Sequence, residues 1–530
     1  MPAMSDRNQY YITTPIYYVN DRPHIGHVYS TTVADAVARF KRLRGLDVFF
    51  LTGTDEHAAK VADKAAENGV TAQEWADRNA EYFERTFNDL GTTHDDFIRT
   101  SQDRHKEGVT RYISQLMETG DVYLGEYEGW YDAGQEEYVP ENKAREYEFK
   151  SPINGKPLVK KSEKNYFFKL SEYSDALLAH LEQQPDFIVP EARMNELVGR
   201  INEGLLDVPM SRTGAAGWGI PVPGDSEHTI YVWIDALFNY LTTVDTEDRR
   251  RFWPADVHLL AKDILWFHAA IWPAMLMALG KIPGNEWIRV PRQICSHSFW
   301  IAEGKKMSKS LGNFVDLEKI SYYVDTFGLD ALRYFLIGYG PIGTGDRDFA
   351  ESRFIEAYNK ELANVVGNGA SRVASMIGRY CDGVLPEATE EVEGTEALQS
   401  AVSGSVARYV KGFEAFRLEL AAQAAVDVFR AVDLYIDRTQ PFKLAKDPAQ
   451  GAAVSSILYH CAEGIRIGSM LLRPILPDRM GELWRRYGLS DPEAMGEDAL
   501  MAWMAWGGGV PGTPIEKGDP LFARYQEEKA

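Results

Sequence analysis

Hydrophobic positions in the first part of the chain alternate between strand-like and helix-like spacing. Residues 9–20, "QYYITTPIYYVN", are rich in β-branched and aromatic side chains, which is typical of a strand. Residues 26–45 repeat apolar positions with helical spacing and stop at a glycine, and residues 46–54, "LDVFFLTGT", have the pattern of a second, buried strand. This order predicts an α/β fold with a doubly wound, Rossmann-like parallel sheet.

The alternation is interrupted once and then gives way to helices. Short aromatic pieces punctuated by Gly and Pro, such as "YLGEYEGWYDAG", predict a small insertion domain with its own sheet. Strand–helix alternation returns at residues 229–241, and the pattern after about residue 350 is that of an all-α helical bundle. We therefore expect a Rossmann-like domain in two halves (1–121 and 226–300), an insertion (122–225), a junction (301–350) and a C-terminal helical domain with a tail (351–530).

Composition fits a protein of several domains. The chain has 530 residues, which is too long for one hydrophobic core, and 45% of them are hydrophobic. No apolar run reaches the roughly 18 residues of a membrane span, and the N-terminus lacks an apolar signal core, so we expect a cytoplasmic protein with no membrane partner. Its three cysteines, Cys295, Cys381 and Cys461, stand far apart, which argues against disulfides and a cysteine zinc site.

The net charge of −21 at first argues against a nucleic-acid partner. Residues 355–490, however, hold 15 Lys and Arg against 17 Asp and Glu, and six of these acids lie within residues 382–396. The acidic excess therefore lies elsewhere, and a basic face on the helical domain remains open.

A histidine pair, His24 and His27, falls where the first strand gives way to the first helix, in "RPHIGHVYS". A helix start offers unpaired N–H groups to an anion, Gly26 permits a close approach, and imidazoles at i and i+3 share one side of the first turn. Structural histidines, phosphate contacts and, with His57 of "GTDEH", a metal site are all compatible with this pattern.

A second motif, "GKKMSKSLGN", spans residues 304–313. Three lysines and two serines in a glycine-flanked loop suit a polyphosphate, although a solvated basic loop has the same composition. Together, "HIGH" and "KMSKS" resemble the paired signatures of the class I aminoacyl-tRNA synthetases. The resemblance implies that ATP, with Mg²⁺, is a substrate. It implies catalytic roles for His24, His27, Lys306 and Lys309. These four residues, together with Gly26, Asp263 and Ser308, are also implied to contact ATP.

Further segments resemble the methionyl-tRNA synthetase family within that class, over essentially the whole chain. These are residues 13–20, "GTDEH", "YVWIDALFNY" and "KDILWFH". The resemblance implies that Asp55 accepts the substrate ammonium and that Pro15, Ile16, Tyr18, Trp233, Ala236, Leu237, Tyr240, Ile264 and His268 enclose the methionine side chain. Aromatic rings suit a polarizable thioether, and an insertion of roughly a hundred residues is too short for a large editing domain.

The chain departs from the family pattern at three places. The insertion has no cysteine, so we predict no structural zinc; Ala261 replaces the usual glycine before Lys-Asp; and Phe442 replaces a stacking tryptophan. In the helical domain, Asn368, Arg372 and Phe442 are implied to read the anticodon, since such groups suit the edges and faces of unstacked bases. The family's appended dimerisation module is missing, so we expect a monomer.

The implied activity is that of a methionine–tRNA ligase. Methionine and ATP would form methionyl-adenylate, and the methionyl group would pass to the 3′-terminal adenosine of methionine tRNA. The alternatives are a class I synthetase for another amino acid, a non-catalytic tRNA-binding relative, and a metallohydrolase that uses His24, His27 and His57.

Overall fold

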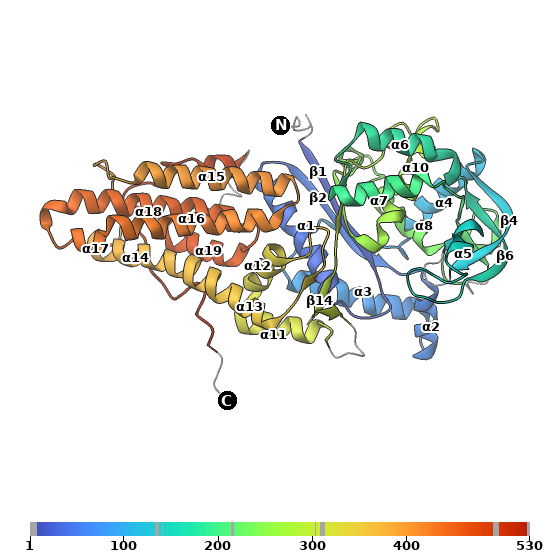
Figure 1. Cartoon of the computed structure of the whole chain (residues 1–530), viewed down its shortest axis with the longest axis horizontal. Helices are drawn as coiled ribbons and strands as arrows, with labels where there is room; N and C mark the ends of the chain where they lie inside the picture. The colour runs from blue at the N-terminus through green and yellow to red at the C-terminus, as the bar shows by residue number, and fades with distance from the viewer. Residues whose placement is uncertain are drawn as a thin grey trace.

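The computed structural model describes residues 8–132, 137–139, 141–213, 217–302, 304–307, 313–490 and 498–526. A bundle of helices forms one end of the elongated molecule, and an α/β part with a small β-rich region forms the other (Figure 1). Within the described ranges, no helix combines the length and the apolar character that crossing a bilayer requires.

A six-stranded parallel sheet forms the centre of the α/β part. Its strands lie in the order β3 (Asp96–Arg99), β2 (Asp47–Asp55), β1 (Gln9–Tyr18), β12 (Val257–Ala261), β13 (Ile294–His297) and β7 (Ile188–Val189). All five neighbouring pairs are parallel. The chain runs outward from β1 through β2 to β3 on one side and from β12 to β13 on the other, where β7 from the inserted segment adds the edge strand. The predicted doubly wound sheet is confirmed, and its switch point lies between β1 and β12.

Helices cover this sheet. They are α1 (Ile25–Leu43), α2 (Ala59–Glu67), α3 (Ala72–Asp89), α4 (Asp103–Glu118), α8 (Val232–Leu237), α9 (Asn239–Thr242) and α10 (Trp272–Gly280), with the short turns η2 (Arg250–Phe252), η3 (Lys262–Ile264) and η4 (Phe267–Ile271). Because both faces are covered, the central strands are buried along most of their length.

The inserted segment forms two small antiparallel sheets. One contains β5 (Glu137–Val139), β4 (Val122–Asp132), β6 (Val159–Phe168) and β8 (Val208–Pro209), and the other β10 (Pro221–Val222), β11 (Asp225–Ile230) and β9 (Ser211–Thr213). Its helices are α5 (Glu141–Glu146), η1 (Leu170–Tyr173), α6 (Ser174–Gln183) and α7 (Glu191–Asn202). Strand β7 lies between α6 and α7 and pairs with β13, so the chain rejoins the central sheet before residue 225.

The junction and the helical part follow. The junction has β14 (Trp300–Ala302), β15 (Lys305–Lys306), β16 (Arg347–Asp348), α11 (Leu317–Phe327) and α12 (Leu329–Tyr339). The helical part has α13 (Glu351–Ala357), η6 (Tyr358–Gly367), α14 (Asn368–Tyr380), α15 (Thr395–Glu414), α16 (Leu418–Thr439), α17 (Pro441–Leu444), η7 (Pro448–Gln450), α18 (Gly451–Leu472), α19 (Pro477–Arg486) and α20 (Ala499–Met504).

One hydrophobic core joins α1 to the bundle. Phe40 of α1 stacks on Phe413 of α15 with ring centroids 4.3 Å apart. In the same region Arg333 of α12 pairs with Asp35 of α1 at 2.6 Å and donates to the carbonyls of Pro474 and Ile475 between α18 and α19. The helix that starts at the histidine pair is therefore packed directly against the helical part.

Candidate active site

A cavity of about 520 Å³ opens at the carboxyl ends of the central strands. It lies at the switch point between β1 and β12, where ligands of doubly wound sheets bind. The cavity is lined by the ten residues expected to hold methionine, Pro15, Ile16, Tyr18, Asp55, Trp233, Ala236, Leu237, Tyr240, Ile264 and His268, and by four expected to hold ATP, His24, Gly26, His27 and Asp263. Segments from both halves of the split domain thus meet around one space.

Pro15 marks an irregularity in β1. The pairing of β1 with β2 changes register between Thr13 and Ile16. Proline has no amide hydrogen to donate to a ladder, so an interruption at this position is expected. Beyond it Ile16 and Tyr18 line the cavity, while Tyr17 packs on Phe83 with ring centroids 5.8 Å apart.

The histidine pair caps the first turn of α1. The backbone amide of Gly26 donates to His24 Nδ1 (3.0 Å), and that of His24 donates to His27 Nδ1 (3.2 Å). The two rings stack with centroids 3.8 Å apart. Burial and the neighbouring His24 hold the pKa of His27 well below its usual value, so His27 is neutral. Because both Nδ1 atoms accept hydrogen bonds, the ring hydrogen of each neutral imidazole lies on Nε2, at the positive end of the helix.

Asp55 ends β2 and is only 2% exposed. Burial, followed by the nearby carboxylates of Asp235 and Glu56, raises the pKa of Asp55 well above its usual value, while the amide of His57 lowers it. Among the described residues nothing donates a hydrogen bond to Asp55 Oδ1. A buried carboxylate oxygen without a donor is costly, and a cationic ligand would remove that cost.

Aromatic rings form another wall of the cavity. Trp233 of α8 meets Tyr18 edge-on at 5.7 Å between centroids and stacks on Phe267 at 4.5 Å. His268 Nδ1 donates to the carbonyl of Ile264 (2.9 Å), so His268 Nε2 accepts the hydroxyl of Tyr240 (2.8 Å). Burial lowers the pKa of His268 to about 4, which keeps this ring neutral. The Tyr240 hydrogen is therefore directed at His268, and its oxygen is left as an acceptor.

The other end of the cavity contains residues that sequence patterns did not single out. Ser30, His297, Ser298, Phe299 and Trp300 line it. His297 Nδ1 donates to the carbonyl of Ser298 (2.8 Å), so His297 Nε2 accepts the hydroxyl of Ser30 (2.8 Å). Burial lowers the pKa of His297 to about 4. The sequence could have pointed to His297 through its place at the end of a parallel strand, at the same edge of the sheet as Asp55 and Asp263.

The described residues on either side of the second motif lie close to the first motif. Lys306 of β15 pairs with Ile301 of β14, while the Lys306 side chain, Ser308 and Lys309 lie outside the residues whose placement is described. After the loop, the ring of Phe314 meets His24 edge-on at 5.2 Å. The residue that follows the second motif, distant in sequence, thus lies against the first motif.

Ala261 and Asp263 lie at the end of β12. Ala261 has an extended backbone (φ −83°, ψ 153°) that any residue adopts, and it lines the cavity together with Asp263. Its methyl group is thus part of the cavity wall, where the family pattern has glycine.

The three residues expected at the anticodon lie at one end of the bundle. Asn368 begins α14 and is exposed, and Phe442 of α17 is 38% exposed. Arg372 donates to Asp437 (3.0 Å) and lies 3.5 Å from Asp433. Asp437 lies near the end of α16 and precedes Phe442 of α17 by only a few residues. The pairing with Arg372 of α14 therefore brings α14 close to this end of α16. Sequence patterns did not indicate that two carboxylates hold the guanidinium.

The described side chains contain no group of three or more His, Cys, Asp or Glu that could hold a metal ion. His57, the third ligand of the metallohydrolase alternative, instead pairs with Asp235 at 2.6 Å. The absence of structural zinc in the insertion stays a prediction, because residues 133–136, 140 and 214–216 lie outside the described ranges.

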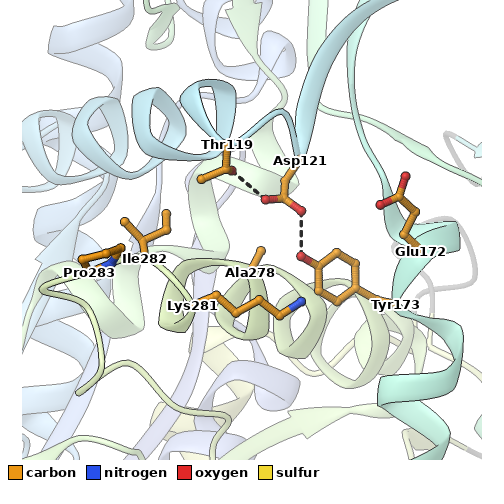
Figure 2. A pocket seen from close by; sticks show the side chains of 8 residues that line it. All are labelled: Thr119, Asp121, Glu172, Tyr173, Ala278, Lys281, Ile282 and Pro283. Atoms are coloured by element: carbon orange, nitrogen blue, oxygen red, sulfur yellow. Dashed lines mark hydrogen bonds between the residues drawn. The ribbon is translucent and has the colours of Figure 1, made fainter.

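A second cavity of about 300 Å³ lies where the insertion meets α4 and α10 (Figure 2). Its polar atoms bind one another: Asp121 accepts hydrogen bonds from Thr119 and Tyr173, both at 2.6 Å, and Lys281 lies over the Tyr173 ring. It shares no residue with the cavity at the switch point. We therefore assign the chemistry to the larger cavity.

Comparisons with known proteins agree with this geometry. The family described as tRNA synthetases class I (M) matches residues 10–147 and 143–374. A methionine–tRNA ligase of Bacillus subtilis is 39% identical over 99% of this chain and 79% of its own length. One of Streptomyces coelicolor is 41% identical over 98% of this chain and 97% of its own length. A Mycobacterium tuberculosis methionyl-tRNA synthetase structure in complex with methionyl-adenylate has a TM-score of 0.88 and 37% identity, covering 97% of this chain and 100% of that one. The chain belongs to the methionine–tRNA ligase family of the class I tRNA synthetases.

Proposed function

We propose that this cavity activates methionine with ATP to give methionyl-adenylate, and that the methionyl group then passes to the terminal adenosine of methionine tRNA. One observation carries the proposal: Asp55 Oδ1, buried and without a donor among the described residues, lies at an aromatic pocket that continues to the start of α1. This arrangement suits a ligand with an ammonium group, an apolar side chain and a phosphate.

Methionine would occupy the end of the cavity with the aromatic walls. Its ammonium would bind Asp55, and its thioether would lie among Tyr18, Trp233 and His268. Sulfur is polarizable and makes favourable contacts with ring edges, but it accepts only weak hydrogen bonds. The hydroxyl of Tyr240 is already bound to His268, so this wall of aromatic rings suits a thioether better than a polar side chain.

ATP, as its Mg²⁺ complex, would occupy the other end. The Nε2–H groups of His24 and His27 and the positive end of α1 would hold the phosphates. Asp263 would contact the ribose. The neutral imidazole of His27 suits this role because its lowered pKa lets it donate a hydrogen bond without titrating near neutral pH.

In the reaction, the methionine carboxylate would attack the α-phosphorus in line and pyrophosphate would leave. The chain's contribution is positioning and stabilisation of the charge that develops on the phosphate oxygens, with no covalent enzyme intermediate. Lys306, Ser308 and Lys309 would close over the phosphates from the loop that ends at Phe314.

Recognition of tRNA would extend to the far end of the bundle. Asn368 and Arg372 would contact anticodon bases, and Phe442 would stack on one of them. Binding would exchange part of the pairing of Arg372 with Asp437 for contacts to the base. That the enzyme acts as a cytoplasmic monomer, without structural zinc, also stays a prediction.

Amino-acid-dependent ATP–pyrophosphate exchange tests the proposal. Assayed with each of the twenty amino acids, the protein should support exchange with methionine alone and then charge methionine tRNA. Exchange with a different amino acid would reassign the pocket. Binding of tRNA without any exchange would identify a non-catalytic relative.

A further inference from the structure

A buried chain of side chains, His57, Asp235 and His105, lies directly behind the amino-acid end of the cavity. Asp235 Oδ2 accepts from His57 Nδ1 at 2.6 Å, and Asp235 Oδ1 accepts from His105 Nε2 at 2.8 Å. His105 Nδ1 lies 3.0 Å from the Thr242 hydroxyl. Asp235 and His105 have no exposed surface. None of the three belongs to the set of residues assigned to substrate above.

The chain connects the two halves of the amino-acid pocket. His57 follows β2, and its backbone amide donates to Asp55, the ammonium acceptor. Its ring binds Asp235, which lies 178 residues away in α8. Asp235 is the one polar residue of α8, whose other residues include Trp233, Ala236 and Leu237 of the pocket wall. A single residue, His57, thus contacts both the ammonium acceptor and the helix that encloses the side chain.

His105 holds this arrangement from outside the cavity. It projects from α4, which carries no lining residue of the cavity at the switch point, and it binds the second oxygen of Asp235. Burial alone would raise the pKa of Asp235, but its electrostatic interactions and hydrogen bonds with His57 and His105 lower it to about 2. Asp235 is therefore ionised, and two ring N–H donors fix both of its oxygens.

We propose that His57, Asp235 and His105 set the distance between Asp55 and the wall of α8, so that His105 is a positioning residue for amino-acid selectivity. This inference rests on the proposed methionine site. A ligand held at its ammonium by Asp55 reaches the wall only if its side chain has the matching length. If α8 is released, the pocket binds methionine less tightly and loses discrimination against a longer thioether such as ethionine.

His105→Leu removes both ring nitrogens at similar volume and is the principal test. In ATP–pyrophosphate exchange, we expect the KM for methionine to rise by about 10-fold, the loss typical of a hydrogen bond to a charged group. The kcat/KM ratio of methionine over ethionine should fall by about 5-fold, within the range that one methylene contributes. The KM for ATP should change by less than about 2-fold, since the nucleotide end lies apart. His105→Gln, whose amide can still donate to Asp235, should restore most of the ratio.

Two further variants keep the test decisive. His180→Leu, on α6 and away from both ends of the cavity, is the matched control and should leave the methionine-to-ethionine ratio unchanged. If His105→Leu does not fold, Thr242→Val removes only the hydroxyl beside His105 Nδ1 and should lower the ratio in the same direction, while Thr242→Ser retains it.

Parallel measurements on Asp55→Asn separate the two proposals. If Asp55→Asn raises the KM for methionine but His105→Leu and Thr242→Val leave the ratio unchanged, the coupling is overturned and the methionine site stands. A parallel loss with methionine, ethionine and ATP in His105→Leu would also overturn it, since that result indicates a general effect on the fold. If Asp55→Asn does not change the KM for methionine, the proposed site itself is wrong.

Discussion

The backbone amide of Ile25 donates a hydrogen bond of 3.1 Å to the carbonyl of Val315. Ile25 is the first residue of α1, within the "HIGH" signature, and Val315 follows the "KMSKS" loop. An isolated bridge between His24 and Asp316 extends the contact. The residues after the loop are thus attached to the N-terminal end of α1, and those before it lie in the β14–β15 pair.

Lys309→Ala should slow methionine-dependent ATP–pyrophosphate exchange. A lysine that contacts the phosphates mainly as charge develops contributes to the transition state, so we expect kcat to fall by about 10²–10³-fold. Methionine affinity, measured by equilibrium binding without ATP, should stay nearly unchanged. Exchange at the wild-type rate would remove Lys309 from the mechanism.

Asp55→Asn should weaken methionine binding by about 10²-fold, because the ammonium would lose its buried charged partner. The same change should make the fold more stable at neutral pH. The raised pKa of Asp55 means that the folded protein favours the protonated form of this carboxyl group. The ionised carboxylate therefore lowers the free energy of unfolding increasingly as the pH rises from the usual aspartate pKa toward the higher pKa of Asp55 in the folded protein. Isothermal titration and thermal unfolding measure the two effects.

Methionine binding should also depend on pH through Asp55. Since its pKa is raised, kcat/KM for methionine should decline on acidification at a higher pH than an ordinary aspartate would cause. Burial raises this pKa most, the carboxylates of Asp235 and Glu56 raise it further, and the amide of His57 lowers it. In Asp55→Asn the decline of kcat/KM on acidification should disappear. If the decline is unaltered in this variant, a group other than Asp55 causes it.

Gly26→Ala tests the histidine pair. An added Cβ would lie 2.9 Å from His24 Cε1, so the ring must move from its stacked position beside His27. We expect kcat/KM for ATP to fall by about 10–100-fold, as is typical when a positioning contact is displaced, with little change in methionine affinity. Gly199→Ala is the control, because its Cβ would meet nothing within 4 Å and it lies in α7.

Arg333→Met should destabilise the protein by about 3–5 kcal/mol, because it leaves Asp35 buried without its main partner. Burial alone would raise the pKa of Asp35, but Arg333 and Arg39 hold it below 3.8. The stabilisation by the Asp35–Arg333 pair is therefore complete above the usual aspartate pKa. It is lost as the pH falls through the lower pKa that Asp35 has in the folded protein. Urea unfolding at neutral and acidic pH should show the difference between wild type and variant shrinking on acidification.

Phe442→Ala should affect tRNA and leave the adenylate step alone. Stacking of a base on an aromatic ring contributes about 1–3 kcal/mol, so the KM for methionine tRNA should rise by about 5–160-fold. ATP–pyrophosphate exchange should be unchanged, since Phe442 lies on α17, in the bundle. Phe442→Trp should bind tRNA at least as tightly as wild type, and an equal loss in both variants would exclude stacking.

Much of the site was predictable because short, contiguous motifs carry it. "HIGH", "GTDEH" and "KDILWFH" each lie at the end of a parallel strand or the start of the following helix, where local pattern suffices to place them. Each of the three motifs contributes residues to one cavity, as expected for strands whose carboxyl ends share an edge. The doubly wound sheet, the inserted sheets and the helical part followed from periodicity in the same way.

Other features depend on partners from distant segments. Ser30 pairs with His297, Asp235 with His57 and His105, and Arg372 with Asp437. Each of these side chains has an ordinary local context, so periodicity and composition do not distinguish it from a core or surface residue. The return of β7 to the central sheet from within the insertion is of the same kind, because two residues, Ile188 and Val189, are too short a run to be recognised as a strand.

The sequence by itself determined the classes of element, their order and the residues whose chemistry fits phosphate, ammonium and thioether. These are local properties, set by side-chain type and spacing. Only the tertiary structure decided the ionisation of Asp55, the tautomers of His24 and His27, and the anchoring of α8 through Asp235. Those properties depend on burial and on which donor lies within hydrogen-bonding distance, and both arise only when distant parts of the chain pack together.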